Sequence, residues 1–167
     1  MIDSQSGKNI ALKRRDHVCA IISNLEKSVA KPICVYFNLS YNLLGEHHPN
    51  ERKAGITTKE RVLTTGAFRW TIRVRIRSRT DPISTFFSHG THLAVLLHEI
   101  AHLRFMNHGI DFAIFLRDIY RYAYGLGIFA CDPKNELPSP WEWERKIWDS
   151  KGAITDSELF QLVNMGT

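Results

Sequence analysis

Residues 96–109 read Leu96-Leu97-His98-Glu99-Ile100-Ala101-His102-Leu103-Arg104-Phe105-Met106-Asn107-His108-Gly109. On an α-helix, His98 and His102 project from the same face one turn apart, because they are four residues apart. Two neutral imidazoles at that separation can share one Zn²⁺ ion, with Glu99 beside them. His108 follows six residues after His102, far enough for the chain to turn and bring back a third ligand. Three protein ligands and a fourth position for water are typical of a catalytic zinc site.

This set of residue types predicts a peptidase with separate metal ligands and base. His98, His102 and His108 would bind the ion through neutral nitrogens, and the ion would make a bound water acidic near neutral pH. Glu99 would take the proton of that water during attack on a peptide carbonyl, then pass it to the leaving amine. Glu99 is not expected to be a ligand, because adjacent side chains diverge by about 100° around a helix. The alternative is that His98 and His102 are ordinary core or surface histidines of a helix.

Three further residues near the motif have two possible roles each. Asp111 follows His108 by three residues. It could orient an imidazole from the second coordination shell, or it could be an aspartate favoured by the dipole at a helix N-terminus. His89 and His92 precede the motif on the same expected helix. They could line the cleft, or they could face solvent or cap the helix.

Length and composition indicate one globular domain over residues 11–167, after a flexible polar segment at residues 1–10. Apolar residues make up 44% of the chain and charged residues 23%, and no apolar run approaches the roughly 20 residues that span a bilayer. We therefore expect no membrane partner. The first residues lack the apolar core of a secretory signal, and the three cysteines suit a reducing compartment. We expect an intracellular protein, nuclear or cytoplasmic, and not a secreted one.

Periodicity along the chain predicts an α+β fold. Apolar residues at helical spacing predict a helix over residues 14–30, which Lys31-Pro32 would end. Residues 57–63 could form a short helix or part of an irregular connection. The remaining expected elements are a strand at 33–39, a strand at 68–79, a motif helix at 89–106 capped by Ser84 or Ser88, a helix ending near Gly125 and Gly127, and a last helix at 156–164 begun by Thr155 or Asp156.

The expected strand at 68–79 alternates apolar and basic residues. Its basic positions are Arg73, Arg75, Arg77 and Arg79, and residues 1–90 carry a net charge of +8 against −3 for residues 91–167. Four guanidinium groups on one strand face would suit phosphate or DNA contacts. The alternative is an exposed sheet face partly neutralised by scattered acidic side chains, where positive charge discourages edge-to-edge aggregation.

Taken together, these motifs resemble the WLM metalloproteases, the Wss-type relatives of the SprT and Spartan DNA–protein crosslink proteases. The resemblance covers about residues 15–125, and the order of its motifs is quite specific. The matching residues are Leu43-Leu44-Gly45, Ile72-Arg73-Val74-Arg75-Ile76-Arg77, His98-Glu99-Ile100-Ala101-His102, His108 and Phe112. The chain departs from the family at Met106-Asn107, where a Gly-Pro often precedes the third histidine.

The resemblance implies a minimal zincin-like metalloprotease domain, a small twisted mixed sheet packed on helices, with substrate lying along an edge strand over one catalytic Zn²⁺. It implies His98, His102 and His108 as zinc ligands, Glu99 as the base, and proteins attached to DNA as substrates. The strand at 70–77 would lie close to the cleft, which makes Arg73 and Arg75 candidates for contact with substrate or DNA. The alternatives are a general peptidase without DNA involvement and a non-catalytic nucleic-acid-binding module on the same fold.

Overall fold

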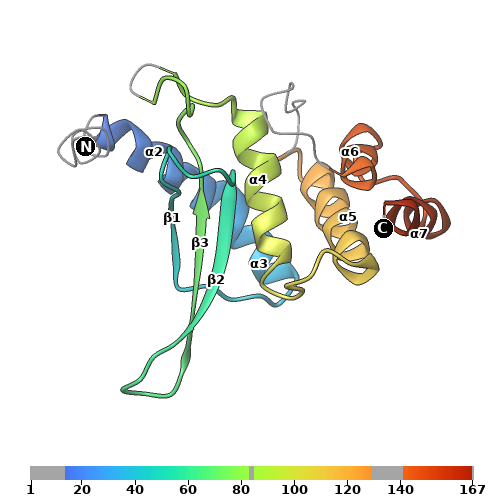
Figure 1. The fold of residues 1–167 in the computed structure, drawn as a ribbon, viewed down its shortest axis with the longest axis horizontal. Helices are drawn as coiled ribbons and strands as arrows, with labels where there is room; N and C mark the ends of the chain where they lie inside the picture. The colour runs from blue at the N-terminus through green and yellow to red at the C-terminus, as the bar shows by residue number, and fades with distance from the viewer. Residues whose placement is uncertain (1–13, 83–84, 129–140, 167) are drawn as a thin grey trace.

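The computed structural model describes residues 14–82, 85–128 and 141–166, and the predicted flexible segment at residues 1–10 lies outside them. Helices pack against a three-stranded mixed sheet (Figure 1), which confirms the predicted α+β class. The elements in chain order are α2 (Arg15–Leu25), the π-helical segment η1 (Glu26–Ala30), α3 (Lys31–Tyr36), β1 (Leu43–Glu46), β2 (Gly55–Arg61), β3 (Phe68–Val74), α4 (His89–Ala101), α5 (Ile110–Gly125), α6 (Glu142–Asp149) and α7 (Asp156–Met165). No helix within the described ranges is long and apolar enough to span a membrane.

The central strand of the sheet is β3, with β1 parallel to it on one side and β2 antiparallel on the other. Its side chains Ile72 and Val74 are fully buried, as the period-two alternation predicts. Helix α4 packs against both β2 and β3. The strand that lies next to both β3 and the motif helix at the edge of the sheet is β2. β3 is thus one strand away from this edge, and its residues do not line the cavity described below.

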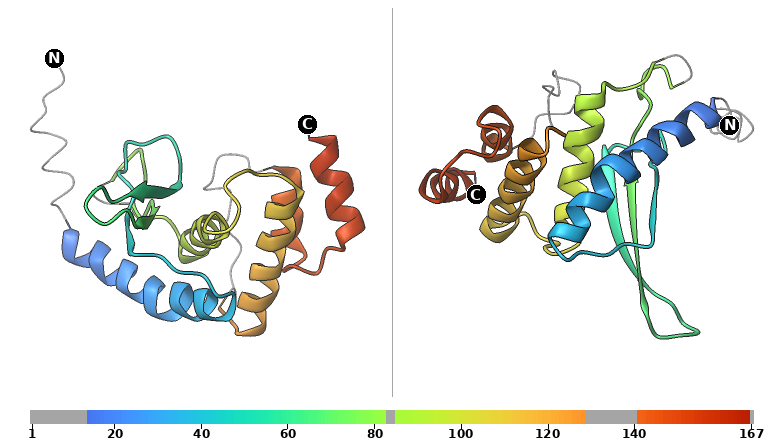
Figure 2. Two further views of the ribbon diagram at one scale, coloured as in Figure 1. Left: turned by 90° about the horizontal axis from the view of Figure 1, so that it is seen from below. Right: turned by 180° about the vertical axis from the view of Figure 1, so that it is seen from behind.

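Helix α4 begins where the sequence predicts. The Ser88 hydroxyl caps it by accepting a hydrogen bond from the backbone N–H of Thr91 at 3.3 Å. The helix is buried on most sides because β2 and β3 cover one side of it and α5 covers another. Figure 2 shows α2, η1 and α3 in line along the back of the sheet and of α4. The motif helix therefore runs through the centre of the molecule, with a supported backbone.

The predicted strand at 33–39 is wrong, because helix continues through Lys31-Pro32 to Tyr36. Pro32 lies in the first turn of α3, where a missing backbone N–H costs little, and the preceding π-helical segment changes the local hydrogen-bond spacing. Burial in this segment follows a helix: Ile33 and Cys34 are buried together, whereas the next two side chains are exposed. The short apolar run is thus one side of a helix facing the core.

Three other boundaries differ from expectation. The motif helix, predicted over residues 89–106, ends at Ala101. Residues 57–63, expected as a short helix or an irregular connection, lie mostly in a strand, because Gly55–Arg61 forms β2. The strand predicted at 68–79 ends at Val74, after which the backbone N–H of Arg75 donates to the carbonyl oxygen of Ala54. The last helix was predicted well: α7 begins after Thr155, whose side chain forms a capping box with Glu158.

The expectation of four exposed arginines on one strand face is wrong. Arg73 and Arg79 are exposed, but Arg75 and Arg77 are 4% and 1% exposed. The Arg75 guanidinium donates to the backbone carbonyl oxygens of Glu51 and Lys53, and Arg77 pairs with Glu46 at 2.8 Å. Regular pairing ends at Val74, and beyond it Arg75 and Arg77 turn into the protein. Arg75 supports the loop between β1 and β2, and Arg77 pairs with the last residue of β1.

Candidate metal centre

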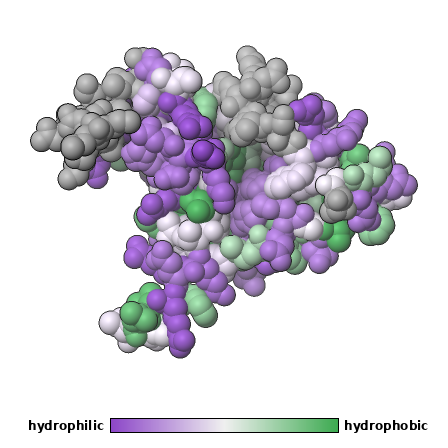
Figure 3. Space-filling model, viewed as in Figure 1, coloured by the Kyte–Doolittle hydropathy of each residue, from purple (hydrophilic) through white to green (hydrophobic). Residues whose placement is uncertain are grey.

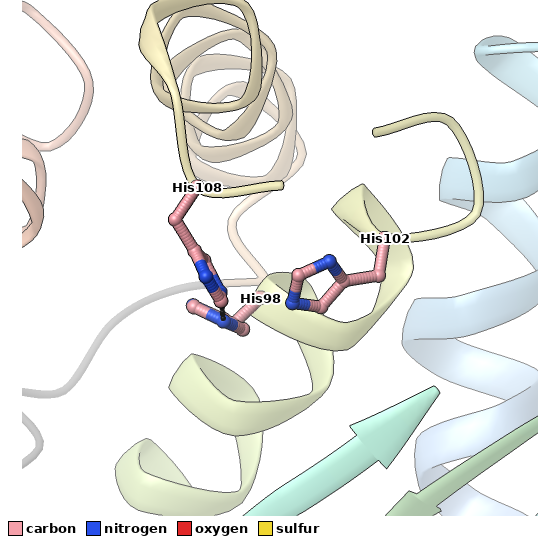
Figure 4. Close-up of side chains that lie close together, drawn as sticks. All are labelled: His98, His102 and His108. Carbon is pink, nitrogen blue, oxygen red and sulfur yellow. Dashed lines mark hydrogen bonds between the residues drawn. The ribbon is translucent and has the colours of Figure 1, made fainter. Parts of the chain in front are cut away.

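Three histidines converge at the C-terminal end of α4 (Figure 4). His98 lies in the last turns of α4, His102 is the residue that caps it, and His108 stands just before α5. One nitrogen from each imidazole can be chosen so that all three lie within 4.8 Å of one another. The Nε2 atoms of His98 and His108 are 3.0 Å apart. The structure thus brings together the three residues that the spacing singled out.

The other ring nitrogens of two of these histidines have their own partners. Nδ1–H of His98 donates to Oε1 of Glu144 at 2.8 Å, and Nδ1–H of His102 donates to the backbone carbonyl oxygen of Phe105 at 2.9 Å. Such contacts fix ring orientation and leave Nε2 free to bind a metal. The buried ring of Phe112 lies 4.6–5.0 Å from each of the three imidazoles, centroid to centroid, and forms the apolar base of the cluster.

The protonation states of His102 and His108 suit metal binding. Burial, and then the charge of His98, lower the pKa of His102 and of His108 to about 4, so both rings are neutral near pH 7. Burial also disfavours the charged form of His98, but its hydrogen bond to Glu144 and the negative charge of that residue raise its pKa overall. A metal ion competes with a proton for such nitrogens, so neutral rings favour metal binding.

Glu99 lies beneath this cluster against the edge strand. Its side chain is 5% exposed, and its Oε2 accepts a hydrogen bond from the hydroxyl of Thr57 in β2 at 2.8 Å. Burial raises the pKa of Glu99 to about 7, although the charge of His98 and the Thr57 hydrogen bond oppose this rise. A carboxylate whose pKa lies near the working pH is well suited to accept and return a proton.

A cavity of about 590 Å³ opens beside these residues. One wall is the segment from Lys53 to Thr57, the opposite wall is α4, and Trp141, Glu144 and Trp148 close it from the side of α6. Trp141 is 45% exposed, and its ring centroid lies 4.4 Å from that of His108. The histidines and Glu99 therefore line an accessible cleft, which is what a site acting on another molecule needs.

The other predicted residues lie elsewhere. Asp111 is exposed in the first turn of α5. Within the described residues, the carboxylate that contacts one of the three clustered histidines is that of Glu144. Neither Arg73 nor Arg75 lines the cavity. His92 is buried, with its Nε2 3.0 Å from the carbonyl oxygen of Ile76.

Sequence reasoning missed Glu144 and Thr57. Glu144 is 46 residues from His98, and no spacing rule connects them. Thr57 lies in a segment whose strand structure was not predicted. The tryptophan-rich stretch around Trp141 and Trp143 was the only sequence signal near Glu144.

Comparison of the chain with models of protein families, with curated proteins and with solved structures found no match.

Proposed function

We propose that this protein is a zinc-dependent peptidase with a zincin-like fold of the WLM type. The observation that carries the proposal is the convergence of three histidine nitrogens beside the buried Glu99, in a cleft bordered by the edge strand β2. The resemblance in the sequence supports the same conclusion through the order of the motifs around His98, His102 and His108.

The donor set fits zinc. At a Zn–N distance of about 2.0–2.1 Å, tetrahedral ligand nitrogens lie about 3.4 Å apart. The ring nitrogens here are 3.0 Å apart for His98 and His108 and within 4.8 Å for the whole set, so small side-chain movements suffice. Glu144, hydrogen-bonded to His98, supplies the carboxylate that commonly supports a zinc-bound imidazole. A bound zinc ion would supply Lewis-acid chemistry and lower the pKa of a coordinated water to about 7.

The residues of the chain would divide the remaining work. The Thr57 hydroxyl occupies Oε2 of Glu99, so Oε1 is the atom that takes a proton from the attacking water and returns it to the leaving amine. The outer edge of β2 would bind an extended peptide, because an edge strand presents backbone N–H and C=O groups that another strand can pair with. Trp141 would limit the access of water to the exposed side of His108.

The test is metal analysis of the purified protein coupled to cleavage of an unstructured protein such as casein. Glu99→Gln is expected to retain zinc and lose at least about 100-fold in rate, since general-base catalysis typically contributes 10²–10⁴-fold. His102→Ala is expected to lose both zinc and activity. Cleavage by Glu99→Gln at the rate of the parent would contradict the mechanism.

We also propose, from the resemblance, that its substrates include proteins attached to DNA. The same cleavage assay with histones, run with and without single-stranded DNA, tests this part separately. Equal rates in the two conditions would indicate a peptidase that acts without DNA.

A further inference from the structure

We propose that the β2–β3 hairpin beyond the cleft is a substrate-binding exosite that selects acidic side chains at alternate positions of an extended polypeptide. This inference rests on the proposed peptidase function and adds the class of sequence that the enzyme prefers. We call the surface formed by Lys59, Arg61, Phe68 and Trp70 the hairpin arm.

The hairpin arm continues the same side of the sheet that faces the site. Directly paired residues of antiparallel strands point to the same face, and here Lys59 pairs with Trp70 and Arg61 with Phe68. Lys59 and Arg61 follow Thr57 at intervals of two residues, so they share its face. Thr57 hydrogen-bonds Glu99, which places that face toward the motif helix.

The arm extends past the body of the protein. Figure 1 shows the hairpin projecting beyond the end of α4, and Figure 3 shows hydrophilic residues along it with hydrophobic ones at its tip. Lys59 and Arg61 lie about 7 and 14 Å along β2 from Thr57, at roughly 3.4 Å per residue. A peptide strand bound in the cleft would reach them within two to four residues.

The hairpin arm is positively charged, and two aromatic rings restrain one of its cationic groups. The Lys59 ammonium lies 4.1 Å from the ring centroid of Phe68 and 5.1 Å from that of Trp70, within the range of cation–π attraction. Arg61 is exposed two residue pairs further along the hairpin. The acidic residue of this strand, Glu60, points to the opposite face, where it pairs across the ladder with Arg69. The arm therefore presents two cations and no carboxylate.

An acidic polypeptide fits these features better than a nucleic acid does. Beside the arm, β2 has a strand neighbour on one side only in the described structure, and its free edge matches the alternating N–H and C=O groups of an extended peptide. Side chains of that peptide would alternate between the two faces, so every second one would lie next to Lys59 or Arg61. Lys53, which lines the cleft itself, adds a third cation along the same path.

The test uses two pairs of fluorogenic peptides that all share the same cleavable centre. In each pair, one peptide carries Asp at alternate positions two to six residues from the scissile bond, and the other carries Asn at the same positions. These positions lie on the N-terminal side of the scissile bond in one pair and on the C-terminal side in the other. We expect kcat/KM of the parent protein to be about tenfold higher for the Asp peptide in one of the two pairs, since each exposed ion pair contributes a few-fold. In Lys59→Glu/Arg61→Glu the ratio should fall to about one.

The matched control is Arg69→Glu/Arg73→Glu, which makes the same change in net charge on the opposite face of the hairpin and should keep the preference. Equal kcat/KM of the parent for the Asp and Asn peptides in both pairs would overturn the proposed exosite and leave the peptidase function intact. If the parent cleaves none of the peptides, the proposed function fails, and fluorescence anisotropy of these peptides with the Glu99→Gln protein decides the exosite by itself. Binding of a labelled oligothymidine that Lys59→Glu/Arg61→Glu abolishes, without any preference for the Asp peptide, would assign the arm to nucleic acid and overturn the proposal.

Discussion

At the scale of single residues, the position of Glu99 depends on the absence of a side chain opposite it. A Cβ at Gly55 would lie 2.7 Å from Oε1 of Glu99 and 2.7 Å from Cγ1 of Val95. Glycine therefore lets the edge strand approach α4 closely enough for Thr57 to reach the carboxylate. Glu99, the proposed base, is thus positioned by two residues of β2: Thr57 through its hydroxyl group and Gly55 through its small size.

We expect Gly55→Ala to lower the free energy of unfolding by about 1–3 kcal/mol, because overpacking a buried contact forces backbone or side chains to move. The same movement should displace Glu99 and reduce peptide cleavage more than zinc binding. Urea unfolding, metal content and cleavage rate measure the three effects. Gly45→Ala is the matched control, since it also lies in a strand and has nothing within 4 Å of its added Cβ. Equal effects of the two substitutions would show that Gly55 has no special role.

At the scale of secondary-structure elements, the C-terminal helices support the site from outside. Glu144 of α6 contacts His98, and α6 packs in turn on α5 and α7. α7 is attached to α5 by the buried Arg117, whose guanidinium donates to the carboxylate of Asp156 at the start of α7. Correct docking of these helices is therefore a condition for the orientation of His98, one of the three proposed metal ligands.

The ion pair between Arg117 and Asp156 predicts a pH dependence of stability. The hydrogen bond from Arg117, followed by its charge, holds the pKa of Asp156 below its ordinary value. Because the folded pKa is lower than the unfolded one, the contribution is fully present above the unfolded pKa, near 4, and is lost as pH falls through the folded pKa. The urea midpoint of the parent should therefore fall more steeply below pH 4 than that of Asp156→Asn. Asp149→Asn, at the exposed end of α6, is the control and should show the same pH dependence as the parent. If the urea midpoint of Asp156→Asn falls as steeply below pH 4 as that of the parent, the ion pair is not the cause.

The elements also show where sequence reasoning succeeds. Alternation through Ile72 and Val74 predicted β3, and the capping residues Ser88 and Thr155 predicted the starts of α4 and α7, because these signals are local. Pro32 was taken as a helix stop, although a first-turn proline is compatible with a helix that resumes after a π-helical segment. β2 was missed because its outer edge borders the cleft and the hairpin leaves the body, so its sequence is largely polar.

The residues of the candidate site also fall into those that local sequence signals predict and those that only packing brings together. The spacing of His98, His102 and Glu99 follows from the period of one helix, and His108 follows after a short turn, so sequence alone could select them. Glu144 and Thr57 come from elements 46 and 42 residues away and meet the motif only through packing. Arg75 was expected at the surface, but its contacts with the carbonyl oxygens of Glu51 and Lys53 depend on where the strand ends.

At the scale of the whole molecule, the candidate metal centre joins two parts of the chain. His98 and His102 belong to the helix that packs on the sheet, and His108 begins the segment leading to α5, on which α6 and α7 pack. A metal ion held by all three would link the sheet side of the molecule to its C-terminal helices. Binding energy at such a site stabilises the folded state as a whole, because the unfolded chain does not preform the site.

We therefore expect zinc to raise the thermal midpoint of the chelator-treated protein. At a free zinc concentration 100 times the dissociation constant, the gain is about 2.7 kcal/mol. For a chain of this size each kcal/mol corresponds to roughly 2–4 °C, so the midpoint should rise by about 5–10 °C. His102→Ala should remove this rise, whereas His89→Ala, an exposed histidine in the first turn of the same helix, should keep it. A similar rise of the midpoint in His102→Ala would mean that zinc binds elsewhere, because the two remaining histidines alone would bind zinc more weakly.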